Sequence, residues 1–220
     1  MYDEDVTDLI ASAREQVAGP VAGNRFLDLL EAGLLPEERL GTLAGELYRL
    51  VRSDLRSCAL LASRFPSPPA GGLFLSMAQG EGEALRLLLD FAAALGMDEK
   101  RLAAHEPSPL AQAYPAYLTQ TALHGTQSDM ALALLANAGE SGRHYARAAD
   151  ALRSRCGFSD VSVGHFLYFA DTPQELLDQA AAVLREGLAR GDDPTEALRT
   201  ARMVHGYEAL FWSSLTEGID

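Results

Sequence analysis

Apolar residues recur along this chain three or four positions apart, the spacing of one face of an α-helix. Residues 3–17 show this clearly, with one stripe formed by Val6, Leu9, Ile10, Ala13 and Val17. Runs rich in Val, Ile and Thr, which favour strands, are nearly absent. The pattern therefore predicts an all-α protein.

Prolines and glycines divide this pattern into segments. The clearest interruption is the Pro-rich stretch 66–69 with the glycines that follow it, yet it is short enough to be a bend between packed helices. The segments expected to be helical are 3–17, 24–32, 35–65, 73–95, 98–104, 110–124, 128–155, 172–189 and a last one from 193 onward. The apolar segment 161–169 fits either a helix or irregular chain.

The connections between these segments are short, and no linker separates two domains. Thr172 is followed by Pro173, Gln174 and Glu175, which is the pattern of a capping box with Pro at the first helical position. We expect one domain over residues 1–220, a bundle of about seven principal helices. The helix within residues 1–20 could lie at its periphery.

Charge and composition narrow the possible partners. The 18 Lys and Arg against 31 Asp and Glu give a net charge of −13, which argues against nucleic acid and against an anionic membrane surface. The two cysteines form no CxxC pair, and the acidic N-terminus does not resemble a signal peptide. No apolar stretch approaches the roughly 20 residues of a membrane span. We expect a cytoplasmic, reduced protein.

The segment Tyr207-Glu208-Ala209-Leu210-Phe211-Trp212 places one carboxylate among large apolar side chains. A carboxylate walled by aromatics loses solvation, and desolvation raises the pKa of such a group toward the range of a general acid or base. Glu208 is therefore the candidate catalytic residue. The alternative is that Glu208 points to solvent while Phe211 and Trp212 pack in the core.

A second polar feature lies in segment 128–155, where Asn137, Ser141 and His144 continue an apolar stripe at helical spacing. Such a line either emerges into solvent or lines a cavity inside the bundle, where all-α proteins build ligand sites. Tyr114 is a candidate wall residue with a polar tip, and ordinary core packing is its alternative. Glu46 lies at the edge of a buried stripe and could face either way.

No metal site is expected. The five histidines form no Glu-x-x-His pair, and Glu81 and Glu83 have no histidine near them in sequence. Phosphate-binding loops, dinucleotide fingerprints, nucleophile elbows and HExxH motifs are absent. We therefore expect no metal and no cofactor.

From about Asn24 to Trp212 the chain resembles the TenA family of thiaminase II and aminopyrimidine aminohydrolases, which has a heme-oxygenase-like fold. Three stretches carry the resemblance: Asn24-Arg25-Phe26 through Gly33-Leu34-Leu35-Pro36; Pro107-Ser108-Pro109 with Tyr114, Gly125 and Leu134-Leu135; and the Tyr207-Glu208-x-x-Phe211-Trp212 closing motif. The resemblance implies a catalytic acid/base at Glu208, a substrate-contacting Tyr114 and an assembly into dimers or tetramers.

The chain departs from that family at several positions. The family cysteine nucleophile falls on Asn137, its helper Tyr on Ser141 and its opening His on Asn24. Its Gln-Asp pair falls on Glu46-Leu47 in a gapless match, so the Asp is missing there. Metallo-oxidases of the same fold need a His-x-x-x-Asp-x-x-His helix, and residues 169–176 contain no His.

These observations predict an enzyme that binds a small, flat, amine-bearing heterocycle in a pocket. One such reaction is the hydrolytic C–N cleavage of an aminopyrimidine in thiamine salvage. Glu208 would be the acid or base, with the substrate bound by Tyr114, Glu46, Asn137, Ser141, Phe211 and Tyr207. One alternative is a small-molecule binder that has lost the chemistry. Another is a biosynthetic enzyme that uses the same pocket for a different C–N bond reaction.

Overall fold

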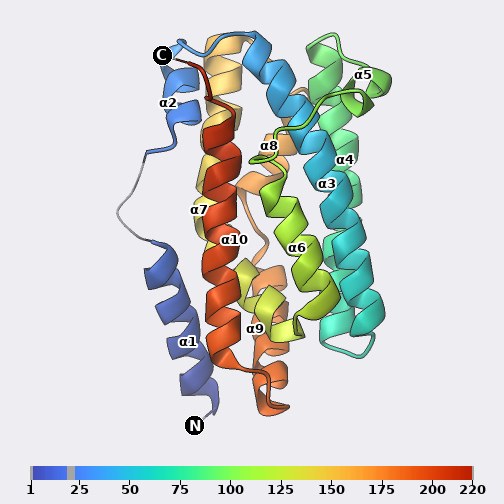
Figure 1. Cartoon of the computed structure of the whole chain (residues 1–220), viewed down its shortest axis with the longest axis vertical. Coiled ribbons are helices and arrows are strands. Elements are labelled where there is room, and N and C mark those ends of the chain that lie inside the picture. The colour runs from blue at the N-terminus through green and yellow to red at the C-terminus, as the bar shows by residue number, and fades with distance from the viewer. Residues whose placement is uncertain (1, 19–22, 220) are drawn as a thin grey trace.

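The computed structural model describes residues 2–18 and 23–219, and within these ranges it contains ten helices and no strand (Figure 1). The helices are α1 (Tyr2–Val17), α2 (Arg25–Ala32), α3 (Glu38–Arg64), α4 (Ala70–Ala94), α5 (Glu99–Ala103), α6 (Ala113–His124), α7 (Gln127–Cys156), α8 (Gly164–Ala170), α9 (Gln174–Ala189) and α10 (Pro194–Ser214). All but α2, α5 and α8 have 12 residues or more. The all-α prediction is confirmed.

Local signals explain most helix ends. Asn24 caps α2 by accepting a hydrogen bond from the Leu27 amide, and Gly33 ends it in the left-handed conformation at φ 70°. Asp193 caps α10 in the same way, with Pro194 at the first position. The apolar segment 161–169, which the sequence left open, contains the helix α8.

The expected capping box at Thr172 is wrong. Pro173, not Thr172, occupies the N-cap position of α9, and no side chain forms a cap hydrogen bond at this helix end. The Thr172 side chain instead faces a cavity described below. A true capping box begins α7, where Thr126 and Asp129 satisfy each other's backbone amides.

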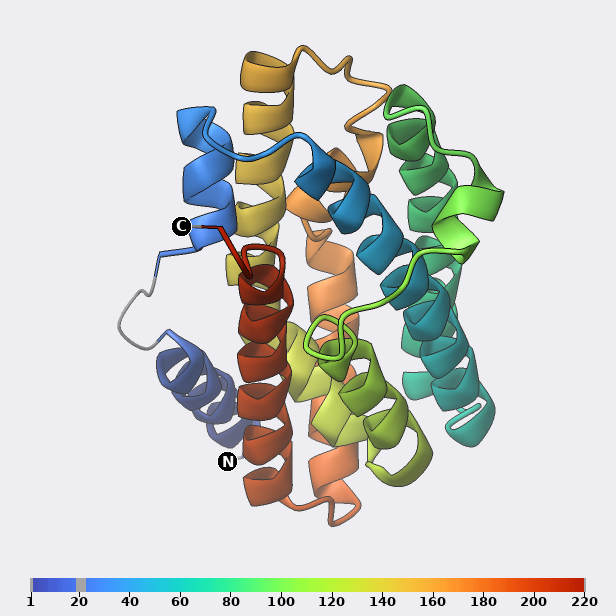
Figure 2. The same cartoon turned by 45° about the horizontal axis from the view of Figure 1, so that its top comes forward.

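The long helices α3 and α4 form an antiparallel pair on one side of the bundle, as Figures 1 and 2 show. On the other side α10 packs along α7, with α1 and α2 on one flank of α10 and α6 on the other. No helix in the described ranges is both long and apolar enough to cross a membrane.

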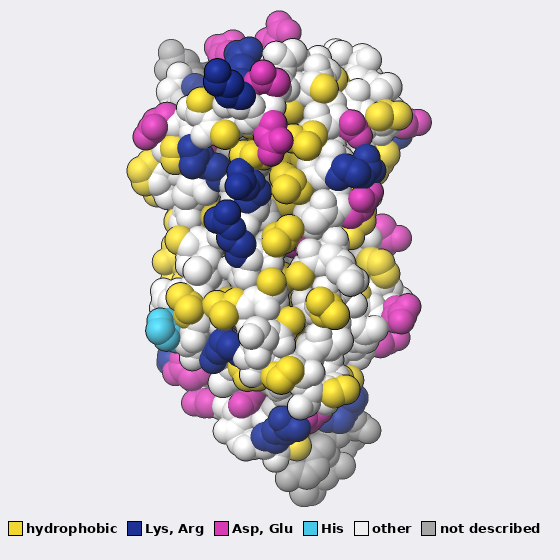
Figure 3. Space-filling model, turned by 90° about the vertical axis from the view of Figure 1, so that its right-hand side faces the viewer, with side chains coloured by type: hydrophobic (Ala, Val, Ile, Leu, Met, Phe, Trp, Pro, Cys, Tyr) yellow, Lys and Arg dark blue, Asp and Glu magenta, His cyan; other side chains and the backbone are white. Residues whose placement is uncertain are grey.

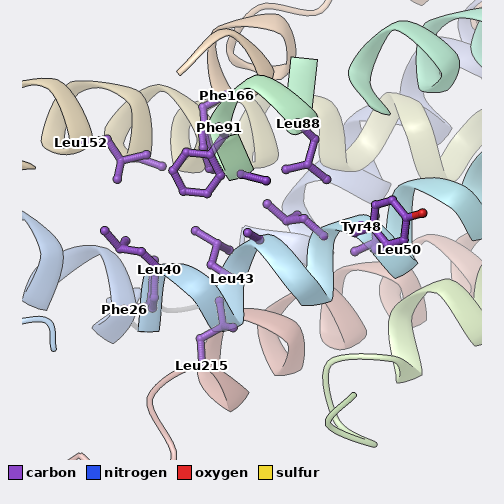
Figure 4. Close-up of a cluster of buried hydrophobic side chains, with 14 of the residues drawn as sticks. Phe26, Leu40, Leu43, Tyr48, Leu50, Leu88, Phe91, Leu152, Phe166 and Leu215 are labelled. Carbon is purple, nitrogen blue, oxygen red and sulfur yellow. The ribbon is translucent and has the colours of Figure 1, made fainter. Parts of the chain in front are cut away.

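The apolar core is divided into two clusters. One lies at the end of the bundle that contains α2 and α8, and Figure 4 shows its side chains from α2, α3, α4, α7 and α8 converging around Phe91 and Phe166. The other lies where α1 and α9 pack, and α1 contributes Val6, Ala13 and Val17 to it. Tyr114 contacts both clusters, so it marks the level at which they meet.

Candidate active site

An internal cavity occupies the junction of the two core clusters. It has a main lobe of about 160 Å³ and an adjoining lobe of about 90 Å³. Helices α3, α4, α6, α7, α8 and α10 all contribute to its wall. The residues common to both lobes are Asp54, Glu81, Tyr114, Ser141, Phe169 and Glu208.

Glu208 faces this cavity from α10, and its side chain is only 15% exposed. Its Oε1 atom is buried and has no hydrogen-bond partner. The nearest basic group is the Nδ1 atom of His144, 3.9 Å from Oε1. Phe211 and Trp212 line the smaller lobe beside it. The carboxylate is thus positioned to meet a ligand rather than bulk water.

The polar line on α7 also reaches the cavity. Asn137 and Ser141 line the main lobe. The Asn137 Nδ2 atom donates to the carbonyls of Ala133 and Ala201 at 2.8 and 3.2 Å, which ties α7 to α10. An amide oxygen at the position of Nδ2 would face two carbonyl oxygens, so the amide orientation is fixed, and the unpartnered Oδ1 atom remains as an acceptor.

Gly142 allows α8 to end close to this part of α7. A Cβ atom at this position would lie 2.9 Å from the carbonyl oxygen of Ala170. A side chain there would push the end of α8 outward, together with Phe169 and Thr172, which line the cavity. The glycine therefore helps to place that wall.

Tyr114 lines both lobes from α6. Burial raises the pKa of its phenol well above the ordinary value, and the Asp54 and Glu208 carboxyls raise it further. Its hydroxyl therefore stays protonated. Tyr207, in contrast, does not line the cavity: its ring packs on Tyr117 with centroids 5.2 Å apart.

Glu46 is buried but lies outside both lobes, contrary to the expected role in binding a substrate. Its carboxylate accepts hydrogen bonds from the Ser108 amide at 2.6 Å and the Gln112 side chain at 2.5 Å. The Nε2 atom of His105 lies 3.1 Å from the Oε1 atom of Glu46. These contacts anchor the segment between α5 and α6 against α3, so Glu46 has a structural role.

Two acidic residues that sequence reasoning did not assign to the site form part of the cavity wall. Asp54, two helical turns after Glu46 on α3, is 5% exposed, and its Oδ1 atom has no partner. Glu81 faces it from α4 with an unpartnered Oε2 atom. Asp54 is thus the buried α3 carboxylate that lines the cavity, whereas Glu46 does not. The signal in the sequence was a carboxylate within an apolar stripe, at Asp54 between Leu50 and Cys58.

These two carboxyls are strongly perturbed. Burial raises the pKa of Glu81 to about 8. Burial, and then the neighbouring Glu81 carboxyl, raise the pKa of Asp54 well above its usual range. No Lys or Arg is found among the residues that line either lobe in the described part of the chain.

Basic side chains lie on the outer surface instead. Figure 3 shows them gathered on the face formed by α3 and its neighbours. There Arg49, Arg52 and Arg56 line a surface groove that is separate from the cavity. The lining of the cavity is therefore acidic, and the basic side chain beside it is His144, next to Glu208.

Cys58 also lines the main lobe, one turn beyond Asp54 on α3. Burial raises the pKa of its thiol well above the usual value, and Glu81 and Asp54 raise it further. The thiolate is the nucleophilic form of cysteine, so these surroundings make Cys58 a poor nucleophile.

The unsatisfied polar atoms of the main lobe share one property. They are Asp54 Oδ1, Glu81 Oε2, Asn137 Oδ1 and Glu208 Oε1, all of them oxygens with no attached hydrogen when the carboxyls are ionised. The smaller lobe adds one unpartnered donor, the indole Nε1 of Trp212. Buried polar groups normally have partners, so the main lobe favours a ligand rich in hydrogen-bond donors.

A metal ion fits this arrangement poorly. Within the described residues, no group of three or more His, Cys, Asp or Glu side chains is arranged to hold one ion. The cavity carboxylates come from α3, α4 and α10 and face the space from different sides. Protein metal sites usually provide at least three ligands around the ion.

The fold and the site together define a helical-bundle protein with an internal acidic cavity. The model of the TENA/THI-4/PQQC family matches residues 25–216. The chain therefore belongs to this family. No protein of curated function matches the sequence.

Solved structures agree with this placement. A TenA homologue from P. horikoshii OT3 is 16% identical, with 96% of this chain and 97% of that chain covered and a TM-score of 0.65. A protein from Silicibacter sp. TM1040, described as a TenA family transcription regulator, is 15% identical over 96% of each chain, with a TM-score of 0.66. A domain of unknown function from Shewanella denitrificans OS217 is 16% identical over 96% and 93%, with a TM-score of 0.53. That domain is described as having a heme oxygenase-like fold, and the likeness extends this fold to the present chain.

Proposed function

We propose that this protein is a TenA-like enzyme that hydrolyses a C–N bond of a small amine-bearing aromatic ring, such as an aminopyrimidine. The observation that carries the proposal is the buried, unpartnered Glu208 oxygen in a cavity whose other free polar atoms in the main lobe are also acceptors. A carboxylate in such a place can exchange a proton with a bound amine or with water.

The size of the cavity favours a single ring. Its main lobe is about 160 Å³, and an apolar cavity of about 150 Å³ is known to hold benzene. A pyrimidine with short substituents suits the main lobe, and the smaller lobe beside Trp212 can take one substituent. Thiamine adds a second ring, so the single-ring amine is the better candidate.

The chemistry follows from the groups present. Water attacks the carbon that bears the amine, and its proton passes to the Glu208 carboxylate. The amine reacts in its protonated form, so when the C–N bond breaks the nitrogen leaves as neutral ammonia with both electrons of that bond. Glu208 then releases the proton taken from water to the solvent. Tyr114 holds the ring in the main lobe, Asn137 and Ser141 orient it, and Phe211 contacts the substituent that enters the smaller lobe. Direct attack by water suits a site in which Asn137 occupies the position of the family cysteine.

The test is ammonia release from 4-amino-5-aminomethyl-2-methylpyrimidine and from thiamine, with the products identified by mass. We expect turnover of the pyrimidine and a roughly 10²–10⁴-fold lower kcat in Glu208→Gln. Glu196→Gln, an exposed residue of the same helix that is paired with Arg199, is the matched control and should keep wild-type activity. Equal rates in Glu208→Gln and wild type would refute the role of Glu208.

A second candidate function is ligand binding without catalysis. The observation that favours it is that the Asn137 side chain donates hydrogen bonds to the carbonyls of Ala133 and Ala201. The residue at the position of the family nucleophile therefore has a structural role here. Tight binding of the aminopyrimidine with recovery of unchanged ligand would support this function over the hydrolase.

A further inference from the structure

The Asp54 and Glu81 carboxyls face one cavity from neighbouring helices, α3 and α4. Neither Asp54 Oδ1 nor Glu81 Oε2 has a hydrogen-bond partner. Two buried carboxylates that repel each other across one cavity resist ionising together without a counter-charge, because desolvation and mutual repulsion both oppose it. The pair therefore retains a proton at neutral pH unless a cation enters.

The surrounding groups do not supply that cation. The titratable side chains around the pair are Cys58 on α3, Tyr114 on α6, Tyr145 on α7, Tyr168 on α8 and Glu208 on α10. Burial raises the pKa of the thiol and of the three phenols, so they are neutral near pH 7. Glu208 can only add negative charge.

Two histidines lie nearby. Burial lowers the pKa of His165 to about 4, so its ring is neutral. His144 does not line either lobe, and its Nδ1 atom lies 3.9 Å from Glu208, so it can balance Glu208 rather than the pair. The charge that compensates Asp54 and Glu81 is therefore left to the ligand.

An independent observation points to the same ligand chemistry. Asn137 is 6% exposed, and its Oδ1 acceptor is also unpartnered in the main lobe. This uncharged group comes from a different helix, and it also requires a donor. An alkylammonium group carries three N–H donors and one positive charge, so it can satisfy several of these oxygens at once.

We infer that Asp54 and Glu81 form an ammonium-binding subsite, which holds a shared proton without ligand and exchanges it for the protonated amine of the ligand. This inference rests on the proposed function only for the identity of the ring to which the amine is attached. It adds a specificity-determining residue, Glu81, and a preference for the cationic form of the ligand.

The subsite has a consequence for turnover. Hydrolysis of an aminomethyl group gives a neutral hydroxymethyl group and ammonia. The neutral product cannot balance the carboxylate pair, so the cavity holds it more weakly than the substrate. Selective binding of the amine thus favours release of the product.

The experiment is calorimetric titration near pH 7 with two matched pairs of probes. They are 4-amino-5-aminomethyl-2-methylpyrimidine with its hydroxymethyl analogue, and benzylamine with benzyl alcohol. Each titration is repeated in buffers that differ in ionisation enthalpy, and the change in binding enthalpy gives the number of protons released on binding. We expect the amine to bind roughly tenfold or more tightly than its alcohol. We also expect about one proton to be released per amine bound, and none per alcohol.

Glu81→Gln should remove most of the preference for the amine and most of the proton release. Its retained binding of the alcohol shows that the variant is folded. Glu83→Gln changes an exposed carboxylate two residues away that is paired with Arg86, so it should behave as wild type.

Equal affinity for amine and alcohol, an absence of proton release, or failure of both amines to bind would overturn the inference. An unchanged amine preference in Glu81→Gln would also overturn it. These outcomes are independent of ammonia release. An amine-selective cavity without turnover refutes the hydrolase alone, and turnover without amine selectivity refutes the subsite alone.

Discussion

Replacing Glu81 by Gln tests whether the cavity carboxyls are protonated in the folded chain. Burial raises the pKa of the Glu81 carboxyl from 4.5 to about 8. Between these values the folded chain holds a proton that the unfolded chain has released. The free energy of unfolding therefore falls as pH rises through this range, and the fall stops above about pH 8.

A second titratable group, His165, determines the pH range in which the effect of Glu81 on stability is measured best. Burial lowers the pKa of His165 from 6.5 to about 4, and this makes stability rise with pH below about 6.5. From pH 6.5 to 8 that opposing slope fades, and it is common to wild type and Glu81→Gln, so it cancels when the two are compared. A carboxyl with a folded pKa of about 8 and an unfolded pKa of 4.5 loses roughly 1.6 kcal/mol over this window. Asp54 acts in the same direction.

The assay is urea unfolding at pH 6.5, 7, 7.5 and 8 for wild type, Glu81→Gln and the exposed control Glu83→Gln. Gln imitates the protonated carboxyl, so Glu81→Gln should gain roughly 1.6 kcal/mol relative to wild type from pH 6.5 to 8. The control should stay parallel to wild type. If Glu81→Gln also runs parallel to wild type, Glu81 is ionised in the folded chain, and the account of a shared proton fails.

Two further changes test other parts of the structure. Phe91→Ala removes a fully buried ring that packs on Phe158 and Phe166 with centroids 5.6 and 5.0 Å apart. Urea unfolding should show a loss of about 3–5 kcal/mol, and a loss below about 1 kcal/mol would contradict the packing. His165→Asn should remove the fall in stability that wild type shows from about pH 6.5 toward pH 4, because the folded wild type excludes a proton that the unfolded chain binds. Thermal melts across that range check this prediction, and an unchanged acid slope would contradict it.

The helices were predictable because helical periodicity and the turn-forming residues are local signals. Asn24, Gly33 and Asp193 define helix ends within a few residues of themselves. The Thr172 capping box was wrong for a tertiary reason. That threonine meets all the local requirements of a cap, yet its side chain faces the cavity rather than the backbone of α9.

The site was only partly predictable, and α3 shows why. Glu46 and Asp54 lie two helical turns apart, and both are buried. The sequence of α3 does not distinguish them, because the difference comes from the segment between α5 and α6. Ser108 and Gln112, 62 and 66 residues after Glu46, hydrogen-bond its carboxylate. Asp54 Oδ1 receives no such partner and remains available to a ligand.

Glu81 shows how stability and function oppose each other in this cavity. A protein selected only for stability would replace a buried, unpartnered carboxyl by a neutral side chain, since its ionisation weakens the folded state above about pH 4.5. The same carboxyl is the group that we infer recognises a cationic ligand. One substitution, Glu81→Gln, should therefore raise the stability of the ligand-free protein near pH 8 and lower its preference for amines. If Glu81→Gln changed the stability near pH 8 without changing the preference for amines, or the reverse, the buried carboxyl of Glu81 would not be the group that binds the amine.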